Sequence, residues 1–589
     1  MKTSTVGVAP EATPRALLRG VPAAPGVARG HWVRIERRSL PAARRIEEGQ
    51  ADAEIARLMA AAEAVAAASE ELASRTREAG LSDEAEIFEA HAAMALDPEL
   101  LGTASGHIRE DAIDAVGAVA AAAAAAAEML RGLDDELLRA RATDVIDVGD
   151  QIAREVAGVP LADVTLSQPM IVVADDLPPS MTATLPRDRL LGIALEGSSP
   201  TAHASILARA YGIPAVVGAA GLLAALTERG PLVELAIDGS TGEIVVAPSP
   251  EDMAAFEQRA ELGRRDRERD LNEASLPVVT RDGTVVTLQA NIGSPAESQA
   301  AVALGARGVG LFRTEFLFLE RSTPPAEDEQ AEAYGAVAEA FAPHPVTIRL
   351  LDVGGDKPIP YLPIAPEDNP FLGVRALRLA ESQRDLFLTQ LRACHRAAAR
   401  GRVKVMAPMV ADAGDVATLS ELAERARAEV SGAGQATGEI ELGVMLEIPS
   451  AILTAATYFD RLRFASLGTN DLLQYTLAVD RGNPALERYR DSLHPALLGL
   501  IRLAVAAAAQ FGIELSVCGE MAGDPVAALA LVGLGVRSLS MAAPGLAAVR
   551  RSIRGASLAD LELAADAALA DRSAAEVRLR FAKLTIAAP

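Results

Sequence analysis

Polar side chains that could do chemistry follow a series of short apolar runs in the second half of the chain. Arginine guanidinium groups bind phosphate and carboxylate oxygens in a bidentate manner, and hard divalent cations prefer carboxylate ligands. Such residues, with two asparagines and one thiol, lie within or just after the ends of the runs: Asn291, Arg313 with Glu315, Arg349 with Asp352, Glu447, Asn470 with Asp471, and Cys518 with Glu520.

One histidine in the first half has a setting suited to nucleophilic chemistry. His203 directly precedes the helical pattern 206–210. Free backbone N–H groups and the helix dipole stabilise an anion at such a position, and Thr201 or Ser205 could donate hydrogen bonds to it. Neutral imidazole is nucleophilic near pH 7, since its reference pKa is about 6.5. A lone histidine is more often structural, so its context must decide.

The elements that would position the first set of residues are strands. The apolar runs cover 285–292, 308–312, 346–351, 403–406, 442–446, 464–467, 515–517 and 537–541, and helical segments separate most of them. Such a repeat over about 300 residues matches a (β/α)₈ barrel, whose active site lies at the carboxyl ends of the strands. Any one polar residue could simply open a solvent-facing loop, but their recurrence at one end favours a functional site.

The first half has a different organisation. Residues 20–35 predict a turn and a short strand, and 44–142 predict a cluster of antiparallel helices, including eight alanines at 120–127 that would let helices approach closely. Strand-like runs at 170–174, 190–194, 215–218 and 243–246 indicate an α/β unit that the helical block interrupts. The highly charged segment 249–274 predicts a solvated connecting helix and a hinge.

Composition limits the class of protein. A chain of 589 residues needs several domains, and a net charge of −24 argues against a nucleic-acid binder. Two cysteines make a disulfide framework implausible and favour a cytoplasmic location. We see no secretory signal and no apolar window long enough to span a bilayer, so we expect no membrane insertion.

Ordered motifs along nearly the whole chain carry a resemblance to a known family. They are GVPAAPGVARG, SPTAHASILARAYGIPAVVG, GVGLFRTEFLF, IRLLDVGGDK, NPFLGVRALR, VMLEIPSA, SLGTNDLLQYTLAVDRGN and CGEMAGDP. The chain resembles phosphoenolpyruvate-utilising enzymes, in particular enzyme I of the bacterial phosphotransferase system. The resemblance implies phosphoenolpyruvate-protein phosphotransferase activity: phosphorylation of a histidine by phosphoenolpyruvate, release of pyruvate, and transfer to the carrier protein HPr in sugar uptake.

The resemblance also implies roles for particular residues. His203 would be the phosphorylated residue, with Arg209 close by, and Cys518 would protonate the enolate of pyruvate. Arg313, Arg349, Arg481, Asn470 and Asp471 would bind phosphoenolpyruvate, and Glu447 with Asp471 would hold Mg²⁺. Weaker candidates for substrate binding are Lys357, Arg375 and Arg378.

The domain organisation that follows combines the pattern with the resemblance. It is a phosphohistidine α/β domain at 1–43 and 143–248, an inserted helical HPr-docking domain at 44–142, a helical linker at 249–276, a phosphoenolpyruvate-binding (β/α)₈ TIM-like barrel at 277–573 and a C-terminal tail at 574–589. We expect the histidine domain to swing about the linker, and the resemblance implies a homodimer through the barrel.

Two departures from the family pattern leave alternatives open. The chain has 198–202 as Ser-Ser-Pro-Thr-Ala where relatives commonly have two glycines and then Thr-Ser, and it has Pro178 where the family often places Thr. A docking protein that binds substrate without transferring phosphate is therefore one alternative, which the complete set of polar residues opposes. An ATP-dependent dikinase is another, but the region before His203 lacks room for a nucleotide-binding domain and has no Gly-rich phosphate loop with Lys.

Overall fold

A computed structural model describes residues 15–586, except 36–38, 48, 79–81, 132–135, 161–165, 167, 200–201, 231, 319–320, 322, 355–358, 360, 363, 366 and 481–482. The chain divides into two compact units, residues 1–267 and 268–589. Each unit buries apolar side chains in its own clusters. Among the described helices, none combines the length of a bilayer span with a sufficiently apolar sequence.

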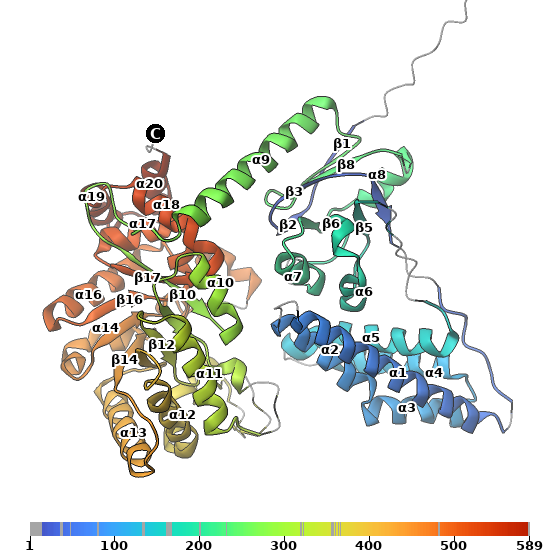
Figure 1. The fold of residues 1–589 in the computed structure, drawn as a ribbon, viewed down its shortest axis with the longest axis horizontal. Coiled ribbons are helices and arrows are strands. Elements are labelled where there is room, and N and C mark those ends of the chain that lie inside the picture. Colours follow the sequence, from blue (N-terminus) through green and yellow to red (C-terminus); the bar gives the residue numbers. More distant parts are fainter. Residues whose placement is uncertain are drawn as a thin grey trace, which may run out of the picture. The chain divides into compact units, whose positions relative to one another are not determined.

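The first unit interleaves sheets with a group of helices (Figure 1). Its described elements are, in order, β1 (Ala16–Arg19), β2 (Val21–Ala24), β3 (Val27–Gly30), β4 (Trp32–Arg34), α1 (Ala51–Glu78), α2 (Ser82–Ala95), α3 (Pro98–Glu110), α4 (Ala115–Arg131), α5 (Glu136–Ala157), β5 (Met170–Ala174), α6 (Pro179–Thr184), β6 (Leu190–Leu195), α7 (His203–Ala210), β7 (Ala215–Val217), α8 (Leu222–Arg229), β8 (Leu235–Asp238), β9 (Glu243–Val246) and α9 (Pro250–Glu273).

The strands of this unit form two sheets. One has the order β1-β9-β8-β3 and is antiparallel throughout. The other has the order β2-β7-β6-β5-β4, in which β2 pairs antiparallel with β7 and the remaining pairs are parallel. The predicted strands at 170–174, 190–194, 215–218 and 243–246 are present, whereas β8, whose run LAID ends on a charge, was not predicted.

The alanine-rich helices pack closely, as predicted. Ala118, Ala122 and Ala123 of α4 are almost fully buried. A Cβ added at Gly149 of α5 would come within 2.4 Å of the Cβ of Ala123, so the two helices meet at a distance that only small residues allow. The helical block extends beyond residue 142, the predicted end, because α5 continues to Ala157.

The charged segment 249–274 forms one continuous helix, α9 (Figure 1). Phe256 is its fully buried apolar side chain. Near its end, Glu273 accepts a hydrogen bond from Arg554 at 3.0 Å, and Asp270 pairs with Arg551. These carboxylates belong to the second unit, and they attach the last turn of α9 to helix α18 (Leu546–Gly555) of the same unit.

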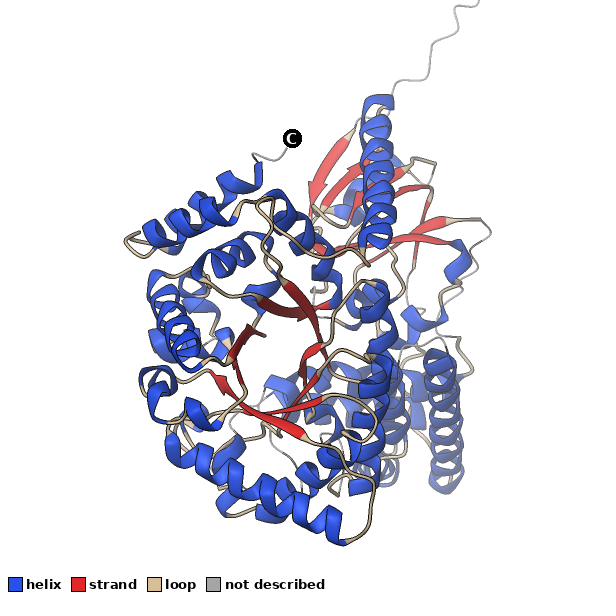
Figure 2. Cartoon of the chain, turned by 60° about the vertical axis from the view of Figure 1, so that its left-hand side comes forward, coloured by secondary structure: helices blue, strands red, loops and turns tan. Residues whose placement is uncertain are grey.

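The second unit contains the predicted barrel (Figure 2). The strands β10 to β17 form a closed ring of parallel pairs, including β17 with β10. Its described strands and α-helices up to α18 are β10 (Thr287–Ile292), α10 (Ser298–Ala303), β11 (Val309–Phe312), α11 (Glu327–Ala340), β12 (Val346–Arg349), α12 (Arg384–Ala397), β13 (Val403–Ala407), α13 (Ala413–Gly432), β14 (Ile440–Leu446), α14 (Pro449–Leu453), β15 (Phe464–Leu467), α15 (Thr469–Leu477), α16 (Pro495–Phe511), β16 (Glu514–Val517), α17 (Pro525–Leu534), β17 (Ser538–Ala542) and α18 (Leu546–Gly555).

Two further helices follow the barrel, α19 (Leu558–Ala568) and α20 (Ala574–Ile586). The sequence prediction treated 574–589 as a tail, but α20 buries Val577 and Phe581 completely in the same apolar cluster as the barrel. The two residues are four positions apart and lie on one face of the helix. This part of the tail is therefore an integral part of the second unit.

Candidate active site

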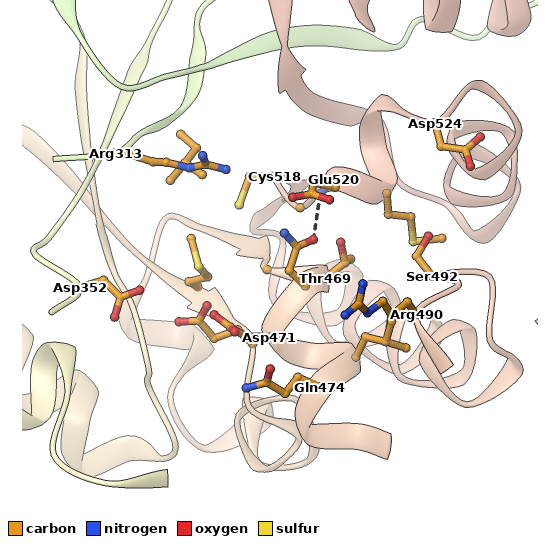
Figure 3. Close-up of a pocket in the computed structure, with 18 of the residues that line it drawn as sticks. Arg313, Asp352, Thr469, Asp471, Gln474, Arg490, Ser492, Cys518, Glu520 and Asp524 are labelled. Atoms are coloured by element: carbon orange, nitrogen blue, oxygen red, sulfur yellow. Dashed lines mark hydrogen bonds between the residues drawn. The ribbon is translucent and has the colours of Figure 1, made fainter. Parts of the chain in front are cut away.

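The loops at the carboxyl ends of the barrel strands surround a cavity of about 800 Å³ (Figure 3). This is the face at which barrels of this type carry their active sites. The residues predicted from the sequence that line it are Arg313, Glu315, Arg349, Asp352, Glu447, Asn470, Asp471, Cys518 and Glu520. The structure thus brings together side chains from five different strand ends.

Two glycines make the close approach of these loops possible. A Cβ at Gly468, which follows β15, would come within 3.0 Å of Glu447. A Cβ at Gly519, which follows Cys518, would lie 2.0 Å from the hydroxyl oxygen of Thr469. Any other residue at Gly519 would push the loops after β15 and β16 apart.

Two arginines bring positive charge to the cavity, and they differ in exposure and in their partners. Arg313, just after β11, is exposed, and its guanidinium makes no hydrogen bond or ion pair with the described residues. Arg349, the last residue of β12, is only 7% exposed and pairs with Glu315 and, at 3.3 Å, with Asp352. Its Nε has no hydrogen-bond partner among the described residues. Arg313 is therefore available to an anion, and Arg349 is held in place with one donor left over.

Electrostatics keep Arg349 charged. Burial acts to lower the pKa of Arg349, but the nearby charges of Glu315, Asp352 and Glu447 outweigh it and raise the pKa above its usual value. A buried guanidinium with carboxylate partners stays ionised at every physiological pH. Its position is therefore fixed before any substrate arrives.

A further arginine lies behind the cavity wall. Arg375, a weaker candidate from the sequence, is 1% exposed and does not line the cavity. Its Nη2 donates to both carboxylate oxygens of Asp352 at 2.9 Å, and it lies 3.9 Å from a carboxylate oxygen of Asp471. Arg375 thus holds two cavity carboxylates, instead of contacting the cavity itself.

Glu447 and Asp471 form a crowded pair of carboxylates. Burial, together with the negative charges of Asp471 and Asp352, raises the pKa of Glu447 to about 8. One oxygen of Glu447 accepts a hydrogen bond from the backbone N–H of Met409 at 2.6 Å. Buried carboxylates that repel one another are a donor set that a divalent cation fits, because its charge offsets the repulsion.

The cation would need ligands beyond these two carboxylates. Among the described residues, no group of three or more His, Cys, Asp or Glu is arranged to hold a metal ion. A hard cation such as Mg²⁺ commonly uses one or two carboxylates and completes its shell with water and substrate oxygens. The pair therefore fits a metal that binds together with an anionic substrate.

Cys518 provides a protonated thiol at the end of β16. It is buried, and burial raises the pKa of its thiol to about 11 although neighbouring Arg349 and Arg313 act in the opposite direction. The thiol donates to the carbonyl oxygen of Leu467 at 3.7 Å. At neutral pH this thiol is protonated and can act as an acid, whereas a nucleophilic cysteine needs to be a thiolate.

Two asparagines orient the loop that carries Cys518. Asn291, on β10, donates to the carbonyl oxygen of Cys518 at 2.9 Å and accepts from the hydroxyl of Ser540 at 2.6 Å. Asn470 accepts from the backbone N–H of Glu520 at 3.0 Å, the bond drawn in Figure 3. Asn470 therefore also connects the loops after β15 and β16.

His203 is the first residue of α7, the helix start that the sequence predicted. In the preceding loop, Ser198 has a φ of 68°, a left-handed conformation that favours glycine. The hydroxyl of Ser205 donates to the carbonyl oxygen of Ser199 at 2.7 Å, so it closes this loop. Ser205 is fully buried.

The surroundings of α7 hold the helix in place. Leu207 is fully buried in a cluster with Phe88 of α2 and Ala73 of α1. Arg209 donates to the carbonyl oxygen of Ala23 at 2.8 Å. Pro178 occupies the position just before α6.

Some predicted residues do not enter the cavity, and others lie outside the described residues. The guanidinium of Arg378 donates to the carbonyl oxygens of Leu372 and Gly373, at 3.1 and 2.9 Å, and does not line the cavity. The remaining three candidates, Arg481, Lys357 and Thr201, fall in segments that the structure does not describe.

The sequence analysis missed residues on one wall of the cavity. Arg490, Asp491, Ser492, Asp524 and Arg578 all line it. None stands at a strand end. Asp524 lies within the motif CGEMAGDP, and residues 490–492 follow the motif SLGTNDLLQYTLAVDRGN, but Arg578 is near neither motif.

Family models match three stretches of the chain. They are described as PEP-utilising enzyme, N-terminal, at residues 19–141; PEP-utilising enzyme, mobile domain, at 166–242; and PEP-utilising enzyme, PEP-binding domain, at 267–558. PEP is phosphoenolpyruvate. The last match includes the strands that surround the cavity.

Individual relatives extend this similarity over nearly the whole chain. The phosphoenolpyruvate-protein phosphotransferase of Priestia megaterium is 37% identical over 571 residues, 96% of this chain and 99% of that protein. That of Streptomyces coelicolor is 43% identical over 566 residues, 95% of this chain and 98% of that protein. The multiphosphoryl transfer protein of Rhodobacter capsulatus is 43% identical over 495 residues, 84% of this chain, but the match spans only 59% of that longer protein.

The chain therefore belongs to the phosphoenolpyruvate-protein phosphotransferases, a family of phosphoenolpyruvate-utilising enzymes. The resemblance found in the sequence motifs is confirmed.

Proposed function

We propose that this enzyme transfers the phosphoryl group of phosphoenolpyruvate to His203, releases pyruvate, and then passes the group to the carrier HPr. The observation that carries the proposal is the barrel cavity, in which two arginines, two crowded carboxylates and a protonated thiol meet. Each feature answers one requirement of phosphoenolpyruvate chemistry.

The substrate would be bound by its two anionic groups. Phosphoenolpyruvate carries a phosphate and a carboxylate, so it needs several cations. The guanidinium of Arg313 makes no hydrogen bond or ion pair with the described residues. Arg349 is held by its carboxylate partners, and its Nε has no partner in the described part of the chain. We propose that Arg481, from an undescribed segment, adds a third cation, and that Asn470 contributes a hydrogen bond to the phosphate.

Glu447 and Asp471 would hold Mg²⁺ together with the substrate. When bound, this ion would offset the negative charge that develops on the transferring phosphoryl group and on the enolate. The two carboxylates supply the oxygen ligands such an ion prefers. Arg375 supports them from behind, since it contacts Asp352 and approaches Asp471.

Cys518 would complete the reaction as the acid. Departure of the phosphoryl group leaves the enolate of pyruvate, which must gain a proton at carbon. The thiol has a pKa of about 11 because it is buried, so it carries its proton throughout the physiological range. The resulting thiolate would be stabilised by the neighbouring arginines before it regains a proton from water.

The remaining steps need His203 to meet both the cavity and the carrier. We propose that the part of the chain carrying His203 moves about helix α9, and that the helical block α1 to α5 binds HPr, as the family resemblance implies. On the same grounds we propose a homodimer through the barrel. A cytoplasmic location is supported by two cysteines that are both free thiols.

The test is incubation of the purified chain with phosphoenolpyruvate labelled in its phosphate, with Mg²⁺ and without ATP. We expect acid-labile label on the wild type and on His31→Ala, a control in the same unit, and none on His203→Ala. Addition of HPr should then remove the label from the enzyme. A wild type that binds phosphoenolpyruvate yet stays unlabelled would refute the proposal and favour a docking protein that does not transfer phosphate.

A further inference from the structure

A bridge of ion pairs crosses one wall of the cavity. Arg578, on α20, donates through Nε and Nη2 to the two oxygens of Asp491 at 3.0 and 2.9 Å. Its Nη1 donates to Asp524 at 2.6 Å. All three residues line the cavity. One guanidinium thus satisfies two carboxylates that come from different barrel loops.

The two carboxylates belong to the connections that carry the proposed chemistry. Asp491 lies between the 3₁₀-helix η8 (Pro484–Tyr489) and α16, in the long connection that follows β15 and contains Asn470 and Asp471. Asp524 follows the 3₁₀-helix η9 (Glu520–Gly523), in the connection after β16 that begins with Cys518. The bridge therefore joins the proposed metal and phosphate residues to the proposed acid.

Each carboxylate is itself fixed to its own backbone. Asp524 caps α17 by accepting from the N–H groups of Val526 and Ala527, at 2.8 and 3.3 Å. Asp491 accepts from the N–H of Leu493 at 3.0 Å. A pull on either side chain is thus transmitted to a helix start or to a loop, so the bridge can fix main-chain positions and not only side chains.

A second link joins the same two connections. Asn470 accepts from the backbone N–H of Glu520 at 3.0 Å. In Figure 3, Asp524 and Ser492 lie on the opposite side of the cavity from Arg313 and Asp352. The bridge therefore lies away from Arg313, which would bind the substrate.

We propose that Arg578 is a positioning residue for the reaction: it fixes the loop after β15 against the loop after β16, and so sets the distance between Asp471 and Cys518. The inference rests on the proposed function for its kinetic consequence. Displacement of a reacting group by about 1 Å can lower a rate about 100-fold without abolishing substrate binding. Arg578 itself would touch no reacting atom.

The structure offers a matched control on the same helix. Arg580 makes an equivalent two-pronged ion pair with Asp571, with Nε at 2.9 Å from one oxygen, and neither residue lines the cavity. Arg580→Ala removes an ion pair of the same kind from α20 and leaves the bridge intact. Any effect that arises only from weakening α20 should appear equally in both variants.

The experiment compares wild type, Arg578→Ala, Arg578→Lys and Arg580→Ala in single-turnover labelling at saturating phosphoenolpyruvate, and measures the Kd of phosphoenolpyruvate with Mg²⁺ in a His203→Ala background. We expect Arg578→Ala to lower the labelling rate about 10- to 100-fold, with Kd changed less than about threefold. Arg578→Lys keeps the charge but not the two-pronged contact, so its rate should be intermediate. Arg580→Ala should match the wild type.

Hydrogen exchange of the backbone separates the inference from the proposed function. Loss of the bridge should speed exchange at 489–494 and 519–524 in Arg578→Ala but not in Arg580→Ala. Equal labelling rates for Arg578→Ala and Arg580→Ala would overturn the positioning role. So would a raised Kd for phosphoenolpyruvate in Arg578→Ala with an unchanged labelling rate. If the wild type is never labelled, the proposed function fails, and the kinetic role of Arg578 fails with it. If hydrogen exchange at both segments of Arg578→Ala is unchanged from the wild type, the bridge does not fix the two loops.

Discussion

Replacement of Cys518 by serine should separate proton transfer from phosphoryl transfer. Serine keeps the shape of the side chain and a hydroxyl proton, but its hydroxyl is a far weaker acid than the thiol. The enolate would then wait for a proton from water, and the reverse reaction would lack the thiolate that must remove a proton from pyruvate. The change should therefore affect the carbon chemistry more than the attack of His203 on phosphorus.

The magnitude follows from the state of the thiol. With a pKa of about 11, roughly one Cys518 in 3,000 is ionised at pH 7.5, so the acid is loaded in nearly every molecule. A positioned general acid typically contributes about 10²- to 10⁴-fold, or about 2.7–5.4 kcal/mol of barrier. We expect Cys518→Ser to lose a factor in that range from any step that makes or breaks the carbon–hydrogen bond.

The assay is isotope exchange between labelled pyruvate and phosphoenolpyruvate, which requires both steps, alongside single-turnover labelling of the protein. Exchange should fall about 10²- to 10⁴-fold in Cys518→Ser, and labelling should fall much less. Cys394→Ala, which alters the other buried cysteine in α12, should leave the ratio of the two rates unchanged. Exchange within tenfold of the wild type, or equal losses in both assays, would refute the role of Cys518 as the acid.

Three further outcomes follow from local structure. Gly149→Ala should destabilise the first unit by about 1–2 kcal/mol in urea unfolding, because its new Cβ would come within 2.4 Å of α4. Gly263→Ala, which has open space around it in α9, should instead stabilise its helix by about 1 kcal/mol. Equal effects of the two changes would contradict the packing argument. Ser198→Gly should raise the free energy of unfolding by about 1 kcal/mol. It relieves the backbone strain of a non-glycine residue at a φ of 68° and removes a buried hydroxyl that has no partner among the described residues. A loss of stability would show that the serine hydroxyl is needed. Alkylation of Cys518 by iodoacetamide needs the thiolate, so its rate should rise about tenfold per pH unit up to about pH 11, while burial keeps the pKa of Cys394 higher and its labelling slower; a plateau near pH 8 would refute the raised pKa of Cys518.

Much of the barrel could be predicted because its signals are local. Each strand is a short apolar run, and β11, β14 and β16 are each followed directly by a residue that can do chemistry. Arg313, Glu447 and Cys518 were therefore recognisable from position alone. The alanine run likewise predicted close helix packing, which the contact of Ala123 with Gly149 confirms. Periodicity and strand-end position are properties of one segment at a time.

The rest depends on contacts between segments far apart in the chain. Nothing near Arg578 indicates that its partners lie 54 and 87 positions earlier. Arg349 and Arg375 both lie within the quoted motifs, yet Arg349 lines the cavity, whereas Arg375 lies behind its wall and donates to Asp352. The hydroxyl of Ser205 was expected to donate to an anion at the start of α7, but it donates to the carbonyl oxygen of Ser199. Contacts of this kind between distant residues cannot be predicted from any short pattern in a single sequence.

The burial of α20 bears on how this chain can be divided for study. The family model for the PEP-binding domain ends at residue 558, and the sequence pattern placed the end of the barrel at 573. A fragment cut at either position would expose the apolar surface that Val577 and Phe581 cover and would leave Asp491 and Asp524 without their shared cation. A fragment that contains the barrel alone should therefore extend at least to residue 586. Poor solubility of a shorter fragment would result from the removal of α20 and would not show that the barrel is unable to fold.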